Sequence, residues 1–226
     1  MTTAKSFSNF NNQTYKNSKS YGNPSLSSRL KIMAALVDKN QKVLDLGCGT
    51  GDFIKILNKK NKEVEGIEIS KKVAQIGQKK GFKIKIADLH STFPYQKNTF
   101  NTITAGEIIE HIYDTDFFLK EIKRILKPNG FLVLSTPNIA TLGRRLMLLF
   151  GVNPLIETSL DHSAGHIRYF TKISLGDLLE KHNFKIINFT SDSINFDQKG
   201  RFKSQILAKA FPTFGARLII KTINLK

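Results

Sequence analysis

Hydrophobic and polar positions repeat along the chain with two different periods. Short apolar runs bounded by glycine, proline or asparagine alternate with segments whose apolar positions lie three or four residues apart. The short runs predict strands at residues 42–46, 63–69, 82–87, 100–105, 131–135, 184–189 and 217–223. The other segments predict helices at residues 25–37, 52–57, 70–80, 114–127, 142–150 and 171–179. This alternation indicates an α/β fold, with a parallel sheet covered by helices on both faces.

The stretch at residues 42–53 combines a buried strand, a glycine-rich turn and the start of a helix. Gly47, Gly49 and Gly51 occupy every second position, which removes side chains where the backbone must bend sharply or let a ligand approach. A helix start also exposes unpaired backbone N–H groups. The turn is therefore predicted to receive a carboxylate or a phosphate.

Length and composition favour one globular domain. The chain has 226 residues, of which 40% are hydrophobic, and shows no internal repeat. Residues 1–24 are rich in serine, asparagine and lysine and are predicted to form a flexible lead-in. Residues 25–226 are expected to form a single domain with an insertion at about residues 136–170.

Cysteine content and hydropathy indicate the cell compartment. Cys48 is the only cysteine, so no internal disulfide can form, as is usual in a reducing cytoplasm. No run of 18 apolar residues occurs, and the first residues lack the apolar core of a secretory signal. We therefore expect a soluble cytoplasmic protein.

The net charge adds a possible partner. It is +17, from 35 basic and 18 acidic residues, and no acid follows Asp197. A strongly basic protein can attract RNA or the anionic surface of a membrane. The charge is therefore compatible with a protein peripheral to the membrane. The simpler interpretation is a basic composition spread over a solvated surface.

Polar residues follow the expected strands where ligands bind in open α/β sheets, at the carboxyl ends of the strands. Glu68 is placed to accept the two hydroxyls of a ribose, and Asp88 to accept an amino group such as that of adenine. Asp45 lies beneath the turn and can face a cationic amino group. These groups suit a ligand with ribose, adenine, an ammonium and a carboxylate.

Two other nucleotide sites fit less well. The dinucleotide fingerprint is G-x-G-x-x-G, whereas this turn has the spacing G-x-G-x-G. A phosphate-binding Walker loop ends in Gly-Lys-Ser or Gly-Lys-Thr, which is absent here. A dinucleotide-dependent oxidoreductase is therefore disfavoured.

A combination of motifs resembles one enzyme family. The run Val-Leu-Asp-Leu-Gly-Cys-Gly-Thr-Gly at residues 43–51 is followed by Glu68, Asp88, Phe93-Pro94, Phe100 and the block Glu107-Ile-Ile-Glu110-His111. Together they resemble class I S-adenosylmethionine-dependent methyltransferases over about residues 25–225. The resemblance implies a Rossmann-like, doubly wound sheet of seven strands, mostly parallel with an antiparallel last strand. Residues 218–223 would form one of the two final strands.

The resemblance also implies a cofactor site for S-adenosyl-L-methionine. The turn would hold the methionine moiety, Asp45 its amino group and Glu68 the ribose. Ile69 and Leu89 would pack on the adenine, and Asp88 would bind its amino group. The implied cofactor-binding residues are Asp45, Gly47, Cys48, Gly49, Gly51, Glu68, Ile69, Asp88 and Leu89. Cys48 is expected to serve as a small residue of the turn and not as a nucleophile.

The residues that could act on the methyl acceptor either follow the fourth expected strand or lie near the end of the insertion. If Glu107, Glu110 and His111 begin a helical turn, they share one face. His162 and His166 lie in the insertion, and Glu107, His111 and His166 are the candidate catalytic residues. The block resembles ubiquinone-biosynthesis O-methyltransferases and small-RNA 2′-O-methyltransferases, in which such residues hold a divalent metal. Here the set would be Glu107, Glu110, His111 and His166, although metal-free relatives carry a similar block, and a metal is not favoured.

The acceptor itself is indicated by a third resemblance. The segments 135–138 and 165–171 are similar to those of methyltransferases associated with cell-surface polysaccharide synthesis. We therefore expect O-methylation of a small-molecule, glycan or lipid-linked acceptor. The alternatives are a metal-dependent RNA 2′-O-methyltransferase and a non-catalytic nucleic-acid-binding module on the same fold.

Overall fold

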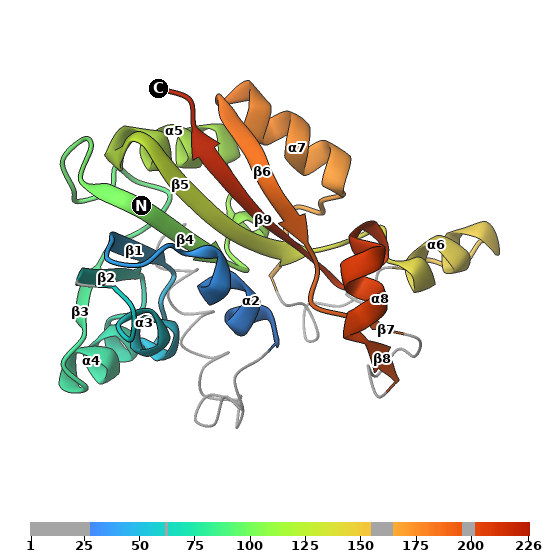
Figure 1. The fold of residues 1–226 in the computed structure, drawn as a ribbon, viewed down its shortest axis with the longest axis horizontal. Helices are drawn as coiled ribbons and strands as arrows, with labels where there is room; N and C mark the ends of the chain where they lie inside the picture. The colour runs from blue at the N-terminus through green and yellow to red at the C-terminus, as the bar shows by residue number, and fades with distance from the viewer. Residues whose placement is uncertain (1–27, 62, 155–164, 196–201) are drawn as a thin grey trace.

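The structure is a computed structural model that describes residues 28–61, 63–154, 165–195 and 202–226 (Figure 1). The expected lead-in at residues 1–24 and the expected start of the first helix lie outside these ranges. So do residues 155–164 of the expected insertion, which include His162.

Seven strands form one sheet in the order β3-β2-β1-β4-β5-β9-β6. They are β1 (Lys42–Leu46), β2 (Glu63–Glu68), β3 (Lys83–Ile86), β4 (Phe100–Gly106), β5 (Leu126–Pro137), β6 (Phe184–Thr190) and β9 (Arg217–Asn224). Strands β1 to β5 pair in parallel, whereas β9 is antiparallel to both of its neighbours, β5 and β6. The predicted fold class is confirmed, and the strand that is last in the chain is the antiparallel one.

Helices cover both faces of this sheet (Figure 1). The helices are α2 (Ser28–Leu36), α3 (Asp52–Leu57), α4 (Lys71–Lys79), η1 (Ile109–His111), α5 (Thr115–Ile125), α6 (Leu142–Leu149), α7 (Lys172–Lys181), α8 (Gln205–Ala210) and η3 (Pro212–Phe214). One hydrophobic core joins Leu44 and Leu46 to α5 and α7. The other joins Val43 to α2, α3 and α4. The alternation of side chains along β1 therefore supplies both cores from one short strand.

Helix starts follow the predicted capping residues. The hydroxyl of Ser70 accepts the Val73 N–H at the start of α4, and Gly81 follows this helix with a φ of +85°. Thr171 and Ser174 form a reciprocal capping box at the start of α7. Side-chain oxygens at these positions satisfy N–H groups that the first turn of a helix leaves unpaired.

The junction of α5 and β5 differs from the prediction. The helix was expected to continue to residue 127 and the strand to begin at residue 131, but α5 ends at Ile125 and β5 begins at Leu126. Leu126 pairs with Phe100, and the register then shifts before Phe131 pairs with Thr102. Asn129 takes a φ of +58° within this irregularity.

Residues 194–214 contain short elements that hydrophobic periodicity did not predict. Strands β7 (Ile194–Asn195) and β8 (Lys203–Ser204) form a separate two-stranded ladder, and α8 and η3 follow it. Strands of two residues are too short to show a period. In the part of the chain that the structure describes, no helix is long and apolar enough to cross a membrane.

Asn138 joins the end of β5 to the segment before β9. Its buried amide Nδ2 donates to the carbonyls of Thr213 (3.0 Å) and Gly215 (2.9 Å), while its Oδ1 accepts the Ala140 N–H at 2.9 Å. This one side chain therefore fixes the two chain segments that leave and enter the sheet at the carboxyl end of β5.

Replacing Asn138 with alanine tests this role. We expect Asn138→Ala to lower the free energy of unfolding by about 3 kcal/mol, because two carbonyls and one N–H lose their partners. Chemical denaturation measures the change. The exposed Asn58 at the end of α3 provides the control, since Asn58→Ala should change stability by less than about 0.5 kcal/mol. Equal stability of the two variants would contradict the assignment.

Candidate active site

The glycine turn adopts a backbone that requires glycine. Gly47, Gly49 and Gly51 have φ values of +65°, +56° and +83°, in the left-handed region that other residues rarely occupy. A Cβ atom at Gly47 would collide with the side chain of Ile108, and one at Gly51 with the ring of Phe82. Both the backbone and the packing therefore require glycine at positions 47 and 51.

Glu68 lies at the end of β2 and binds the turn. Its buried carboxylate accepts the Gly49 N–H at 3.1 Å and the Ser70 N–H at 2.8 Å. Burial raises the pKa of Glu68, while these backbone N–H groups oppose the rise. The carboxylate thus joins the turn after β1 to the start of α4, at the place from which it is predicted to hold a ribose.

Asp45 lies in β1 beneath the turn. It is buried, and the hydroxyl of Thr104 in β4 donates to its Oδ1 at 2.6 Å. Burial raises the pKa of Asp45 to about 7, against the opposing effects of the Thr104 hydrogen bond and the charge of Arg29. The carboxyl group therefore changes protonation near neutral pH, and a cationic partner would favour its ionised form.

The residues predicted to surround the adenine follow β2 and β3. Asp88 Oδ1 accepts the backbone N–H of His90 and lies 2.9 Å from His90 Nδ1. Leu89 is buried, whereas Ile69 is partly exposed. All three lie beyond the carboxyl ends of neighbouring parallel strands, as the prediction requires.

Cys48 fits the role of a small buried residue in the turn. Its Sγ lies so close to Gly66 that a Cβ atom at position 66 would collide with it. Burial raises the pKa of the Cys48 thiol well above its usual range. The thiol therefore stays protonated, which is unsuitable for a nucleophile.

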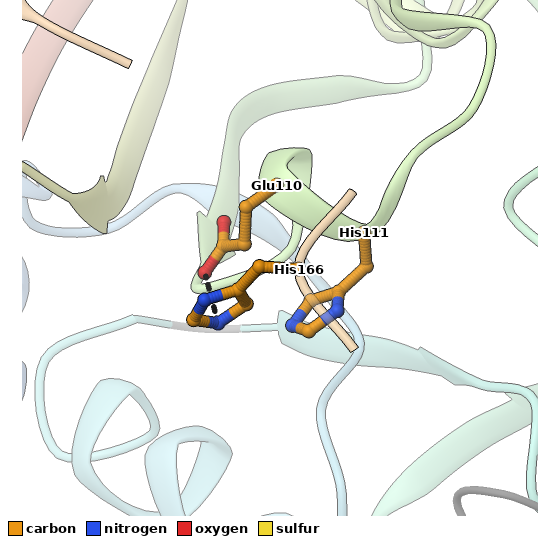
Figure 2. Close-up of side chains that lie close together, drawn as sticks. All are labelled: Glu110, His111 and His166. Atoms are coloured by element: carbon orange, nitrogen blue, oxygen red, sulfur yellow. Dashed lines mark ion pairs between the residues drawn. The ribbon is translucent and has the colours of Figure 1, made fainter. Parts of the chain in front are cut away.

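On the acceptor side, Glu110, His111 and His166 gather in one cluster (Figure 2). Their ligand atoms lie within 4.8 Å of one another. Glu110 Oε1 is 4.0 Å from His166 Nε2, and the rings of the two histidines are 4.9 Å apart. Because the Glu110 carbonyl accepts the N–H groups of Ile167 and Arg168, the end of the insertion is held against η1.

The carboxyl group of Glu110 is only 1% exposed. Its Oε2 accepts the Thr136 hydroxyl at 2.9 Å, but its Oε1 has no hydrogen-bond partner among the residues that the structure describes. Burial, and secondarily the charge of Glu107, raise the pKa of Glu110 to about 8. An acid that titrates near neutral pH beside two imidazoles can accept and return a proton, and the same oxygen and nitrogen atoms can coordinate a divalent cation.

Glu107 does not join this cluster. The expectation that residues 107, 110 and 111 share one helical face is wrong, because Glu107 has a φ of +59° and η1 begins only at Ile109. The carboxylate of Glu107 instead accepts the Ser135 hydroxyl at 2.8 Å and pairs with Arg217 at 3.2 Å. Arg217 also pairs with Asp192, at 2.8 Å.

Sequence reasoning missed the residues that hold Glu107 and Glu110. Arg217 is 110 positions from Glu107, and Thr136 is 26 positions from Glu110. Thr136 belongs to the segment 135–138, which resembles a segment of other methyltransferases. This resemblance was a signal that could have indicated a role for Thr136 in the site. For Arg217 and Asp192 no local pattern distinguishes them from other charged residues.

The sequence of this chain matches known methyltransferases. A family model described as a methyltransferase domain matches residues 20–188. The chain is 32% identical over 165 residues to a ubiquinone biosynthesis O-methyltransferase of Pelagibacter ubique. This match spans 70% of the chain and 67% of that protein. It is 34% identical over 113 residues to a demethylmenaquinone methyltransferase of Staphylococcus aureus, a match that spans 46% of this chain and about half (47%) of that enzyme.

Solved structures have the same fold. A possible histamine N-methyltransferase of Thermotoga maritima superimposes with a TM-score of 0.69 at 22% identity, over 96% of this chain and 98% of that one. The YcgJ protein of Bacillus subtilis superimposes with a TM-score of 0.63 at 17% identity, over 88% of this chain and 98% of that one. The seven-stranded sheet described above is therefore the methyltransferase sheet.

Glu68→Gln tests the predicted ribose contact. We expect the Kd for S-adenosylmethionine to rise about tenfold or more, because the amide offers one acceptor oxygen where the carboxylate offers two charged ones. Calorimetric titration measures the Kd. Glu63→Gln, at the opposite end of β2, is the matched control and should leave it unchanged. Unchanged binding in Glu68→Gln would show that Glu68 does not hold the cofactor.

The raised pKa of Asp45 predicts a pH dependence of cofactor binding. Below pH 7 this carboxyl group becomes neutral and no longer attracts the ammonium of the methionine moiety, so affinity should fall by up to about tenfold per pH unit. Calorimetric titrations at several pH values below and above 7 measure this slope. Asp45→Asn should bind more weakly and lose the slope, and an unaltered slope in that variant would assign the titration to another group.

Proposed function

We propose that this chain, which belongs to the S-adenosylmethionine-dependent methyltransferases, methylates a hydroxyl oxygen. The acceptor would be a small molecule, a glycan or a lipid-linked compound. The observation that carries the proposal is the buried Glu110 carboxyl group, with one unpartnered oxygen facing His166. The relative from Pelagibacter ubique, named as an O-methyltransferase of ubiquinone biosynthesis, supports a hydroxyl acceptor.

The chemistry of methyl transfer explains why this cluster matters. The sulfonium methyl group is displaced by an oxygen that must approach in line with the breaking C–S bond, so that positioning supplies much of the rate. A neutral hydroxyl also has to lose its proton, which a base of matched pKa can accept. A Glu110 pKa of about 8, close to an imidazole, suits that task near neutral pH.

The glycine turn and the cluster of Glu110, His111 and His166 lie at the same end of the sheet, which supports their use as donor and acceptor sites. The glycine turn follows the carboxyl end of β1, and η1 follows the carboxyl end of the adjacent β4. Ile108, which immediately precedes η1, packs so closely on Gly47 that no Cβ atom fits there. A methyl donor seated on the turn is therefore next to the segment that carries Glu110 and His111.

A second candidate role for the cluster is to hold a divalent cation. The three ligand atoms within 4.8 Å and the unpartnered Glu110 Oε1 fit a mixed oxygen and nitrogen site. Glu110, His111 and His166 would supply the ligands, and the cation would stabilise the negative charge of the acceptor oxygen. Glu107 contributes only if its contacts with Ser135 and Arg217 are broken.

Glu110→Gln tests the cluster directly. We expect kcat for transfer of a labelled methyl group to fall by about 10²- to 10⁴-fold while the Kd for S-adenosylmethionine stays the same, because only proton removal is affected. The acceptors to be screened are catechol-type phenols, glycans, lipid-linked sugars and RNA. Glu180→Gln, an exposed change on α7, is the matched control and should retain full activity.

Chelation separates the two roles of the cluster. Activity that is lost with a chelator and restored by Mg²⁺ assigns the cluster to a cation, whereas activity that is insensitive to chelation assigns it to proton transfer. Full activity of Glu110→Gln, or methylation of carbon or nitrogen alone, would contradict the proposed function.

A further inference from the structure

Helix α6 exposes apolar side chains instead of burying them. None of its residues is buried, and at its end Leu149 and Phe150 are 75% and 78% exposed. Single exposed apolar residues are ordinary, but a consecutive group of them indicates a binding surface. Figure 1 shows α6 projecting away from the sheet.

Helix α8 adds a second group of exposed apolar residues beside α6. Ile206 is 81% exposed, and Phe211 just after α8 is 55% exposed. Both helices contact β7, and the guanidinium of Arg145 in α6 lies 5.0 Å from the centre of the Phe214 ring in η3. We call these neighbouring groups the α6–α8 surface; its apolar members are Leu148, Leu149, Phe150, Ile206 and Phe211.

The described segments that form the α6–α8 surface carry basic residues and no acidic ones. Residues 139–154 contain Arg144 and Arg145 but no acid, and residues 202–226 contain five basic residues and no acid. Among the latter, Lys203 and Lys209 are exposed next to the apolar residues of α8. This combination of apolar and basic side chains is typical of helices that lie in the headgroup region of a bilayer.

The α6–α8 surface belongs to the end of the sheet that carries the candidate active site. Helix α6 follows the carboxyl end of β5, and η3 leads into the start of β9. Asn138 holds these two segments together, and Arg217 at the start of β9 pairs with Glu107. A bilayer bound to this surface would therefore lie on the acceptor side of the protein.

We propose that the α6–α8 surface binds a membrane containing anionic phospholipids, with the apolar residues inserted among the headgroups and the basic residues paired with lipid phosphates. RNA would satisfy the basic residues but leave Leu149, Phe150 and Ile206 in water. A second copy of the chain would bring basic residues against basic residues, since neither segment carries an acid. The proposal does not depend on which acceptor is methylated.

Vesicle co-sedimentation of the full chain tests this proposal. Wild-type protein should bind vesicles of phosphatidylglycerol and phosphatidylcholine, bind vesicles of phosphatidylcholine alone more weakly, and be released in part by salt. Leu149→Asp/Phe150→Asp should lower the partition coefficient by about tenfold or more, because two apolar insertions are lost. The control is Ile76→Asp on α4, half-exposed in a helix that packs on β2 and β3 at the opposite end of the sheet, which should bind normally.

A charge variant tests the electrostatic part separately. Lys203→Glu/Lys209→Glu should weaken binding to anionic vesicles, whereas Lys72→Glu/Lys79→Glu on α4 changes the net charge equally and should have less effect. Calorimetric titration with S-adenosylmethionine, run on every variant, shows that the cofactor site is intact. Wild-type protein that binds no vesicles, equal loss in both charge variants, or a dimer that only Leu149→Asp/Phe150→Asp dissociates would each overturn the proposal.

Discussion

The contact of one buried carboxylate with two backbone N–H groups organises the glycine turn and the helix start beside it. Glu68 ends β2 and accepts N–H groups from Gly49, in the turn after β1, and from Ser70, which begins α4. A buried carboxylate is costly unless it is hydrogen-bonded, so these bonds hold the turn in its left-handed conformation against the sheet. Gly47, Gly49 and Gly51 carry no side chains, so the backbone of this turn is the part that we propose to contact the cofactor.

The acceptor side depends on contacts between distant parts of the chain. The backbone carbonyl of Glu110 accepts two N–H groups from the segment after His166, which brings that histidine to Glu110 and His111. The carboxylate of Glu107 does not join them, because it accepts the Ser135 hydroxyl and pairs with Arg217. One carboxylate after β4 is therefore held by an arginine, while the next remains buried with an unpartnered oxygen. That difference in environment gives Glu110 its raised pKa and its suitability for proton transfer.

Local sequence patterns predicted the glycine turn and most of the sheet. Strand β1 is a short apolar run interrupted by Asp45, and the glycine spacing at residues 47–51 distinguishes this turn from a dinucleotide loop. The predictions failed where structure depends on distant partners. No local pattern shows that Asn129 adopts a positive φ as β5 begins early, or that Glu107 turns away from residues 110 and 111 toward Arg217. The two-residue strands β7 and β8 are too short to have a period.

The central claim is that the cofactor bound to the glycine turn presents its methyl group to the cluster of Glu110, His111 and His166. A crystal structure with bound S-adenosylhomocysteine, the demethylated cofactor, tests it most directly. We expect the ribose hydroxyls on Glu68, the methionine carboxylate at the turn, and the sulfur atom facing the cluster. A ligand bound elsewhere, or a sulfur atom directed away from Glu110 and His166, would contradict the account.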